Sequence, residues 1–574
     1  MAAKSIPALL EEIAALLEIK GENPFKVRAY YNAAHVLAGL ENLETVVREK
    51  RLREIKGIGE TLSKKIEEYA VTGRMNYYEE LIREVPASLL ELMQVPNLGP
   101  KKIKLLYEQL GITNLGELEY ACKENRLISL FRFGEKTQDK ILKGVEFLKR
   151  HKGEYRLGEI YPLAMQIKER FEKVLQPGYV EVCGSIRRRK EIVRDVDLLV
   201  AGKDWAALSS RFISMPEVEE VIAEGETKTS CRLHSGIEAD LRVVPEESYA
   251  CALLHFTGSK EHNVKLRGFA KKKGFKLNEY GLFGNGPAGP FRTEEEVYRF
   301  LGLSYMAPEI REDTGEIEAA LEGKLPQLVR LEDVKGTFHV HTAESDGSAT
   351  LEQIADEARK MGLSYVGITD HSKSAYYAGG LREDQVRRQW EAIDRFNAEN
   401  KGFHFFKGIE SDILPDGDLD FDMEVLSGFD FVIGSIHSVF TMKRQEIEKR
   451  IIRALENPYM TMLGHPTGRL LLAREGYDVD MRTIIEEAAR CHVIIELNAS
   501  PYRFDIDWRH LKFASEKGVM ISINPDAHSL RDLHDIYYGV GIARKGWLEK
   551  KDVLNTRSAD QIREIFARLK ASKG

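Results

Sequence analysis

Residues 184–200 read GSIRRRKEIVRDVDLLV, and this stretch decides the fold of the middle of the chain. In a β-strand successive side chains point to opposite faces, so Asp195 and Asp197 share one face while Val196 and Leu198 share the other. Two carboxylates on one face form a site for hard divalent cations. The stretch therefore predicts a strand of an α/β domain, with apolar side chains towards a core and a Mg²⁺ or Mn²⁺ site on the opposite face.

The sequence around this strand adds further features of phosphoryl transfer. A second alternating stretch at 239–244 offers Asp240, and three carboxylates can hold two metal ions about 4 Å apart. Upstream, Gly184 and Ser185 permit close backbone approach, and the arginine run that contains Arg188 supplies donors suited to a triphosphate. An Asp-x-Asp pair alone is usually a solvated strand end, but the combination predicts nucleotidyl transfer.

A second pattern begins at residue 335, where seven short apolar runs alternate with amphipathic helical sequence. Almost every run ends in histidine or a carboxylate, and the C-terminal strand ends of a βα barrel converge on one mouth. Mixed imidazole and carboxylate ligands suit zinc, manganese or iron better than magnesium or calcium. These runs therefore predict a second metal site, built from His339, His341, His371, Glu410, His437, His465, Asp526 and His528.

The first part of the chain is helical in pattern, with glycine turns repeated at 56–60, 97–101 and 132–136. These turns resemble helix-hairpin-helix elements, whose amides at a helix N-terminus can bind a DNA phosphate. One such turn is usually only a tight connection, whereas the repetition favours DNA contact at the first two. Arg132 occupies the position of the first glycine in the third and argues against contact there. The candidate DNA-binding residues are Gly57, Gly59, Gly99 and Lys101.

Length and composition limit the class of protein. A chain of 574 residues is too long for one ordinary core, so several domains are expected. The net charge of −7 does not exclude DNA binding, because a local basic face is enough to attract phosphates. The five cysteines are scattered, and no apolar run approaches the roughly 20 residues of a membrane span. A cytoplasmic protein without a membrane partner is therefore expected.

The residues up to about 315 resemble a bacterial-type family X DNA polymerase of the DNA polymerase beta type. The resemblance rests on 184–200, on His-Phe-Thr-Gly-Ser at 255–259 and on Leu-Asn-Glu-Tyr at 277–280. It implies that Asp195 and Asp197 bind both metal ions and that Asp240 binds the catalytic one. It implies that Gly184, Ser185 and Arg188 hold the nucleotide phosphates. The remaining contacts, to the sugar and base and to the template minor groove, would come from Phe256, Gly258, Asn263 and Arg267.

The sequence departs from the family pattern at two positions. Arg194 stands where the family has glycine, and it is expected to crowd the nucleotide. His255 replaces a tyrosine near the sugar, which puts sugar discrimination in question. A further hypothesis pairs Arg242 with Asp197 when the site is open.

The segment 21–40 resembles the small DNA-binding domain of the same family. Lys65 aligns with the lysine that forms a Schiff base during deoxyribose-phosphate removal. An amine needs a lowered pKa to act as a nucleophile, so the alternative is a solvated helix lysine beside Lys64.

Residues 335–574 resemble the polymerase-and-histidinol-phosphatase (PHP) family, which implies a distorted seven-stranded barrel with up to three Zn²⁺ or Mn²⁺ ions. The resemblance adds Asp346 to the eight ligands above. It implies three groups: His339, His341, Glu410 and Asp526; Glu410, His437 and His465; and Asp346, His371 and His528. Metal-activated water then implies phosphoester hydrolysis, and fusion to a polymerase points to 3′–5′ exonuclease action or DNA 3′-end processing.

The predicted fold class is multidomain α/β. The expected domains are a helical DNA-binding or lyase-like domain (1–80), a fingers-like helix-hairpin-helix domain (81–154), a nucleotidyltransferase palm (155–247), a thumb-like domain (248–315), a linker (316–334) and a PHP phosphoesterase domain (335–574).

The predicted function is gap filling in base excision repair with 3′-end trimming, by a monomer acting on gapped or primer-template DNA and deoxynucleoside triphosphates. One alternative is a PHP nuclease, or an enzyme that processes abasic (AP) sites, whose palm mainly holds DNA because Arg194 hinders the nucleotide. A less favoured alternative is a non-catalytic DNA-binding scaffold. The intact palm carboxylates argue against the first alternative, and the intact PHP ligand set argues against the second.

Overall fold

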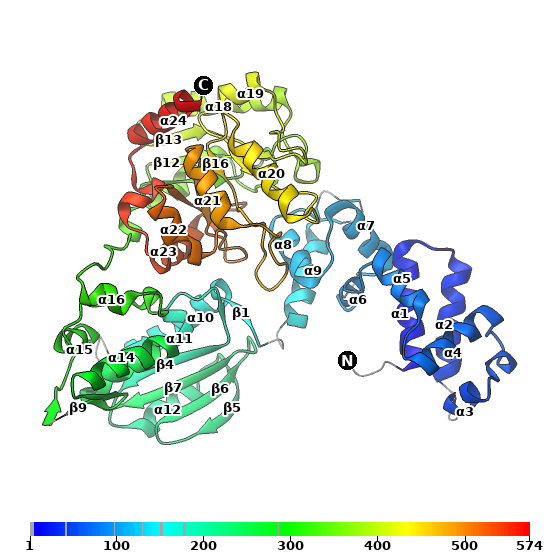
Figure 1. The fold of residues 1–574 in the computed structure, drawn as a ribbon, viewed down its shortest axis with the longest axis horizontal. Coiled ribbons are helices and arrows are strands. Elements are labelled where there is room, and N and C mark those ends of the chain that lie inside the picture. Colours follow the sequence, from blue (N-terminus) through cyan, green and yellow to red (C-terminus); the bar gives the residue numbers. More distant parts are fainter. Residues whose placement is uncertain are drawn as a thin grey trace. The chain divides into compact units, whose positions relative to one another are not determined.

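The computed structural model describes residues 5–573 except 39, 41–42, 97, 129, 132, 150–152, 176–178 and 285. Asn97 and Arg132 of the predicted hairpins thus lie outside the described residues. The chain forms two compact units, Met1–Lys149 and Arg150–Gly574, and Figure 1 shows the helical character of the first and the mixed character of the second. The predicted multidomain α/β class is confirmed.

The first unit consists of helices in its described part, because leucine and isoleucine recur there at helical spacing and bury one stripe per helix. Gly59 and Gly99 cap the N-termini of the helices that follow the first two predicted hairpins. The helices are α1 (Ile6–Lys20), α2 (Pro24–Ala38), α3 (Leu43–Arg48), α4 (Glu60–Thr72), α5 (Asn76–Glu84), α6 (Leu89–Leu92), α7 (Pro100–Leu110), α8 (Leu115–Lys123) and α9 (Glu135–Lys149).

The second unit begins with a five-stranded sheet in the order β2-β4-β7-β6-β5 (Figure 1). Its central pair, β4 and β7, is parallel, and the other neighbours are antiparallel. Val196, Leu198 and Val200 are buried in the core with Phe171 of α10, as their alternation with the aspartates predicts. The elements are β1 (Tyr155–Arg156), α10 (Leu157–Glu172), β2 (Val180–Val182), α11 (Gly184–Arg187), β3 (Ile192–Val193), β4 (Asp195–Ala201), α12 (Trp205–Ile213), β5 (Val218–Glu224), β6 (Lys228–Leu233) and β7 (Glu238–Val244).

A smaller subdomain with its own core follows this palm sheet. Helix α13 ends at Thr257, and the next residues turn directly into α14, so the His-Phe-Thr-Gly-Ser segment lies at a helix junction. The elements are α13 (Tyr249–Thr257), α14 (Lys260–Lys272), β8 (Lys276–Asn278), β9 (Gly281–Gly284), β10 (Gly286–Ala288), α15 (Glu294–Phe300), η3 (Pro308–Ile310) and α16 (Glu316–Leu321). The predicted linker therefore begins with a helix, and Leu328 pairs with Glu549 as an isolated β-bridge.

The C-terminal part is built from parallel strands in two sheets, β11-β12-β13 and β14-β15-β16-β17-β18. Isolated parallel bridges join the sheets at both sides, Val340 with Ala527 and His371 with Glu410, so the strands close around one centre. The strands are β11 (Gly336–Val340), β12 (Tyr365–Ile368), β13 (His404–Lys407), β14 (Glu410–Asp412), β15 (Ile433–Ser435), β16 (Met462–Leu463), β17 (Ile494–Asn498) and β18 (Ile521–Asn524).

Amphipathic helices accompany these strands on the outside, as the alternation of apolar runs and helical sequence predicts (Figure 1). Each buries an apolar stripe against the barrel. They are α17 (Leu351–Lys360), α18 (Glu383–Glu399), α19 (Met423–Gly428), α20 (Arg444–Leu455), α21 (Met481–Arg490), α22 (Trp508–Glu516), α23 (Ile536–Lys545) and α24 (Ala559–Lys573).

Candidate metal centres

The three palm aspartates lie on one face of two adjacent strands. Asp197 of β4 stands directly opposite Asp240 of β7 in the parallel register, and Asp195 lies two residues before Asp197 on the same face. Ser230 Oγ donates to Asp240 Oδ1 at 2.6 Å, and Lys228 Nζ lies 2.6 Å from Asp240 Oδ2. The predicted carboxylate group is therefore assembled, and Lys228 pairs with one of its members.

The electrostatics of this group favour a bound cation. Burial, together with the charge of Asp195, raises the pKa of Asp197 to about 6. Burial and the neighbouring Asp240 also raise the pKa of Asp195. Carboxylates that disfavour one another's ionised form are stabilised by a divalent cation placed between them. The donor set thus fits the Mg²⁺ or Mn²⁺ that the sequence predicts.

Gly184 brings the turn that is predicted to bind phosphate against the aspartates. Its φ of +60° lies in the left-handed region, and an added Cβ would lie 2.6 Å from Asp197 Oδ2. Both the backbone conformation and the available space therefore require glycine at this position.

Replacing Gly184 with alanine is expected to lower nucleotide addition by about 100-fold, because the methyl group would displace Asp197 and shift a metal ligand. Initial rates of primer extension would measure this effect, with 3′-end trimming as the internal control. Alanine at Gly268, where a Cβ would have nothing within 4 Å, is the matched glycine control. Equal rates for G184A and the unaltered protein would contradict the close approach.

The predicted triphosphate residues gather beside this turn. Ser185 Oγ is buried and makes no hydrogen bond to any residue that the structure describes. Arg188 Nε donates to Glu312 Oε1 at 3.1 Å, and its Nη1 donates to the main-chain oxygen of Thr257. An added Cβ at Gly258 would lie 2.9 Å from Arg188 Nη1, so the absence of a side chain at Gly258 leaves room for the Arg188 guanidinium. A hydroxyl without a partner keeps its capacity to donate a hydrogen bond to a bound ligand.

The remaining predicted nucleotide contacts lie at the junction of α13 and α14. Asn263 Nδ2 donates to the main-chain oxygen of His255 at 2.7 Å, which links the α14 side chain to the end of α13. Arg267 is exposed, and its Nε donates to the main-chain oxygen of Asn263 at 3.2 Å. The Phe256 and His255 rings meet edge to face, 5.0 Å apart. These side chains thus form one connected group.

Two arginines have partners that the sequence does not indicate, and crowding of the nucleotide by Arg194 stays a prediction. The Arg194 side chain is 75% exposed and pairs with Glu154 at 2.6 Å, so its charge is turned to solvent and to another carboxylate. Arg242 forms no described ion pair with Asp197; its guanidinium lies 4.4 Å from the centre of the Phe256 ring instead. An aromatic face competes well for a desolvated guanidinium, which accounts for the second of these contacts.

The second centre gathers around Glu410 at the start of β14. Its carboxylate oxygens lie 3.2 Å from His339 Nε2, 2.9 Å from His371 Nδ1, 3.2 Å from His437 Nε2 and 3.0 Å from His465 Nε2. His339, His371, Glu410 and His465 are buried and His437 is partly buried, and they come from different strand ends. The convergence of widely separated residues that the barrel pattern predicts is thus present.

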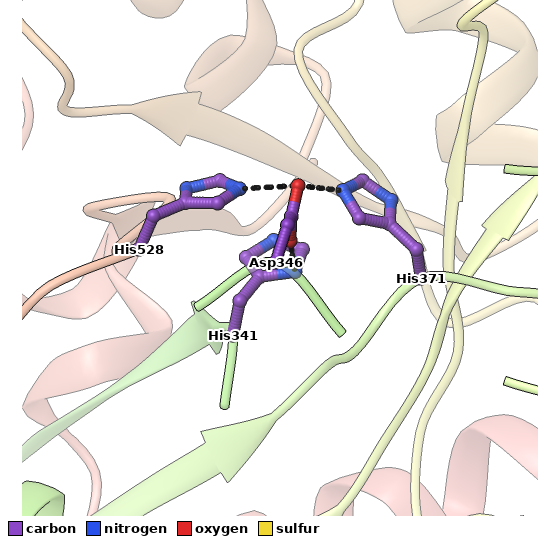
Figure 2. A group of neighbouring side chains, drawn as sticks. All are labelled: His341, Asp346, His371 and His528. Carbon is purple, nitrogen blue, oxygen red and sulfur yellow. Dashed lines mark ion pairs between the residues drawn. The ribbon is translucent and has the colours of Figure 1, made fainter. Parts of the chain in front are cut away.

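Figure 2 shows the neighbouring cluster of His341, Asp346, His371 and His528. Asp346 Oδ2 lies between two imidazoles, 3.4 Å from His371 Nε2 and 3.4 Å from His528 Nε2. His339, His341 and Asp526 form a further group. These groups differ in part from those that the PHP resemblance implies. His341 belongs to two groups, and His371 also lies with Glu410 and His437.

The chemistry of this donor set fits metal ions. His339 Nε2 and both ring nitrogens of His341 are buried and make no hydrogen bond to the described part of the chain. Burial and the neighbouring imidazoles lower the pKa of His341 to about 3, so its neutral ring can act as a ligand. His339 and Asp526 have positive φ angles of 59° and 54°. Such strained backbone is retained where the surroundings fix a side chain at a functional site.

Two residues outside the predicted ligand set orient the imidazoles. Glu496 Oε2 lies 2.6 Å from His339 Nδ1, and Asp412 Oδ1 lies 2.5 Å from His437 Nδ1. Each leaves the Nε2 atom of its histidine directed at Glu410, as carboxylates behind metal-binding histidines do. Glu496 lies inside the apolar run that forms β17, so a carboxylate there carried a signal, whereas Asp412 had none.

In the first unit, Lys65 is half-buried among tyrosines. Its Nζ donates to Tyr30 Oη at 2.8 Å and lies 3.1 Å from the centre of the Tyr77 ring. Burial, with the charge of Lys26, lowers the pKa of Lys65 to about 8. Lys64, by contrast, is exposed and pairs with Glu60.

The predicted DNA-contacting residues of the first unit are exposed. An added Cβ at Gly57, Gly59 or Gly99 would have no described atom within 4 Å, so these turns face open space. Lys101 lies in the first turn of α7, directly after the second hairpin. Within the described residues, no helix is long and apolar enough to cross a membrane.

Family models match four segments of the chain. They are a helix-hairpin-helix domain (1–75), a SAM-like helix-hairpin-helix tandem (89–146), a DNA polymerase beta thumb (252–312) and a PHP domain (337–500). The segments follow the order that the sequence patterns predict.

Full-length comparison agrees with these matches. The chain is 39% identical to the DNA polymerase/3′-5′ exonuclease PolX of Bacillus subtilis (strain 168) over 570 residues, which cover 98% of this chain and 99% of that protein. It is 27% identical to DNA polymerase lambda of Rattus norvegicus over 53% of this chain and 55% of that protein. It is also 27% identical to a probable phosphatase of Thermoanaerobacter sp. (strain X514), over 41% of this chain and 96% of that protein. The chain therefore belongs to the PolX family, the family X DNA polymerases that carry a C-terminal PHP domain.

Proposed function

We propose that this protein is a DNA-directed DNA polymerase that fills short gaps in base excision repair and also trims DNA 3′ ends. The observation that carries the polymerase activity is the convergence of Asp195, Asp197 and Asp240 beside the buried, unpartnered Ser185 hydroxyl. The name of the Bacillus subtilis relative states both activities. The substrates are gapped or primer-template DNA and deoxynucleoside triphosphates, used by a monomer in the cytoplasm.

In the palm, Mg²⁺ or Mn²⁺ held by the three aspartates would acidify the primer 3′-hydroxyl and neutralise charge on the phosphates. The chain's own residues bind and orient the nucleotide. Ser185 donates its hydroxyl to a phosphate oxygen. The Arg188 guanidinium, which Glu312 holds by a hydrogen bond and for which Gly258 leaves room, binds the phosphates as well. Gly184 keeps this turn in contact with the metal ligands.

The thumb-like subdomain recognises the rest of the substrate. Phe256, Gly258 and Asn263 lie together at the junction of α13 and α14, where they would line the sugar and base. The exposed Arg267, one turn further along α14, would reach the template strand. The exposed glycine turns of the first unit would bind DNA phosphates through their amides.

In the barrel, up to three Zn²⁺ or Mn²⁺ ions would supply a hydroxide and neutralise a phosphodiester. Nine side chains are available to hold them: His339, His341, Asp346, His371, Glu410, His437, His465, Asp526 and His528. Glu496 and Asp412 keep His339 and His437 in the tautomer that presents Nε2 to the centre. A DNA 3′ end is the substrate that couples this hydrolysis to the polymerase.

Template-directed addition is the direct test of the proposed polymerase. A duplex with a one-nucleotide gap is incubated with Mn²⁺ and each of the four nucleotides separately. Only the complementary nucleotide should extend the primer efficiently. Trimming of the primer without extension by any nucleotide would instead support a nuclease, or an enzyme of AP sites, whose palm only holds DNA.

A deoxyribose-phosphate lyase activity is a second candidate function, favoured by the surroundings of Lys65. The neutral amine is the nucleophile, and burial has already lowered its pKa to about 8. Lyase activity should therefore rise as pH increases through about 8 and then level off.

This pH profile can be measured by trapping the covalent adduct with borohydride on a duplex with an incised abasic site. Lys65→Ala should abolish the adduct, whereas Lys64→Ala, the adjacent exposed lysine, should retain it. An unchanged adduct yield in K65A would exclude this lysine as the nucleophile.

A further inference from the structure

The barrel and the palm pack closely within the second unit, and glycines mark two of the closest approaches. An added Cβ at Gly158 of α10 would lie 2.4 Å from Pro501 of the PHP part. An added Cβ at Gly541 of α23 would lie 3.1 Å from Arg189, the residue after Arg188 in the arginine run. Helix α23 of the PHP part therefore lies directly against the phosphate-binding turn of the palm.

One lysine of this helix reaches the phosphate-binding arginine. Lys545 is the last residue of α23, and its side chain is fully buried. Its Nζ donates to the main-chain oxygen of Arg188 at 3.0 Å and to Glu312 Oε1 at 2.6 Å. The same Glu312 oxygen accepts the Arg188 Nε hydrogen bond at 3.1 Å. A single carboxylate oxygen thus joins a PHP lysine to an arginine of the palm.

The contact between Lys545 and Glu312 is a buried ion pair and not only a packing contact. A buried ammonium group is retained only where it is paired and hydrogen-bonded, and Glu312 and the Arg188 carbonyl fulfil that need. Glu312 is 8% exposed and Arg188 11% exposed, so solvent screens their interaction little. Lys190, a third cation near Glu312 besides Lys545 and Arg188, lies further away at 3.8 Å. Lys545 is therefore the principal anchor of Glu312.

We propose that Lys545 of the PHP domain is a positioning residue of the polymerase site, which fixes Arg188 through Glu312 for binding the nucleotide triphosphate. The inference rests on the proposed polymerase function and on the role of Arg188 in it. Lys545 touches neither substrate nor metal; it holds both the main chain and, through Glu312, the side chain of Arg188. The PHP domain thereby contributes to nucleotide addition independently of its own hydrolytic site.

The test uses the full-length protein, gapped DNA and Mn²⁺, and separates KM for the nucleotide from kcat. Lys545→Met should raise KM by about tenfold and leave kcat within about twofold, because a charge-assisted hydrogen bond that orders the binding residue is lost. Glu312→Gln should raise KM in the same way. Arg544→Met is the matched control: this neighbouring cation of α23 pairs with Glu309 and makes no described contact with Arg188.

Two further measurements allow each outcome to be interpreted. Trimming of 3′ ends by K545M should stay unchanged, which shows that its barrel is folded; if K545M does not fold, E312Q carries the test. In an Arg188→Ala background, K545M should add no further rise in KM, because its effect passes through that arginine. An unchanged KM in folded K545M and E312Q, an equal effect of R544M, or a full effect in the R188A background would overturn the inference. Failure of the unaltered protein to add any nucleotide would instead refute the proposed polymerase.

Discussion

Replacing Asp240 with asparagine is expected to reduce nucleotide addition by about 10³-fold or more, while 3′-end trimming continues at its original rate. Asp240 stands opposite Asp197 in the parallel register, and an amide in its place removes one anionic metal ligand without changing size. The substitution also breaks the ion pair with the partly exposed Lys228, which has little effect on folding stability. Single-nucleotide incorporation under saturating Mn²⁺ would measure the loss.

The matched control for this variant is Glu220→Gln on the edge strand β5 of the same sheet. Glu220 is exposed, pairs with Arg232 and has no part in the carboxylate group. Its replacement should leave both activities within about twofold of the original. Persistent extension by D240N would remove the palm aspartates from the mechanism.

Replacing Glu410 with glutamine is expected to abolish 3′-end trimming, by about 10³-fold or more, while single-nucleotide addition is retained. The Glu410 carboxylate lies within 3.2 Å of ring nitrogens of His339, His371, His437 and His465. Loss of its charge would weaken binding of every metal ion that these histidines share with it. Measured metal content of the purified variant should fall together with activity.

Asp418→Asn provides the control within the same domain, because Asp418 is an exposed carboxylate that pairs only with Arg453 among the described ion pairs. It should keep both its metal content and its trimming rate. Retention of trimming by E410Q would place hydrolysis outside the barrel centre.

Local alternation and strand-end position were sufficient to predict much of both centres. The Asp-x-Asp spacing predicted a shared face, and β4 has it. The position of histidines at the ends of apolar runs predicted convergence, because parallel strands of a barrel bring their C-terminal ends together. Glu410 joins this centre although it begins β14, directly after the run that forms β13, and lies far in sequence from His339 and His465.

Side-chain contacts that depend on competition between residues far apart in the chain could not be predicted from the sequence. Arg242 was expected to pair with Asp197 but lies over the Phe256 ring, and which contact wins depends on burial rather than spacing. His341 and His371 each belong to two of the candidate metal groups, because of the directions of their side chains at the barrel mouth. Lys545 carried no signal at all, since its link to Arg188 spans more than half the chain.

The most direct test of two independent metal centres follows one 5′-labelled primer in a one-nucleotide gap, with Mn²⁺, with and without the complementary nucleotide. The unaltered protein should extend the primer by one nucleotide when the nucleotide is present and shorten it when the nucleotide is absent. D240N should only shorten the primer, and E410Q should only extend it. Loss of both activities in either variant, with the fold intact, would contradict the assignment of addition to the palm and of removal to the barrel.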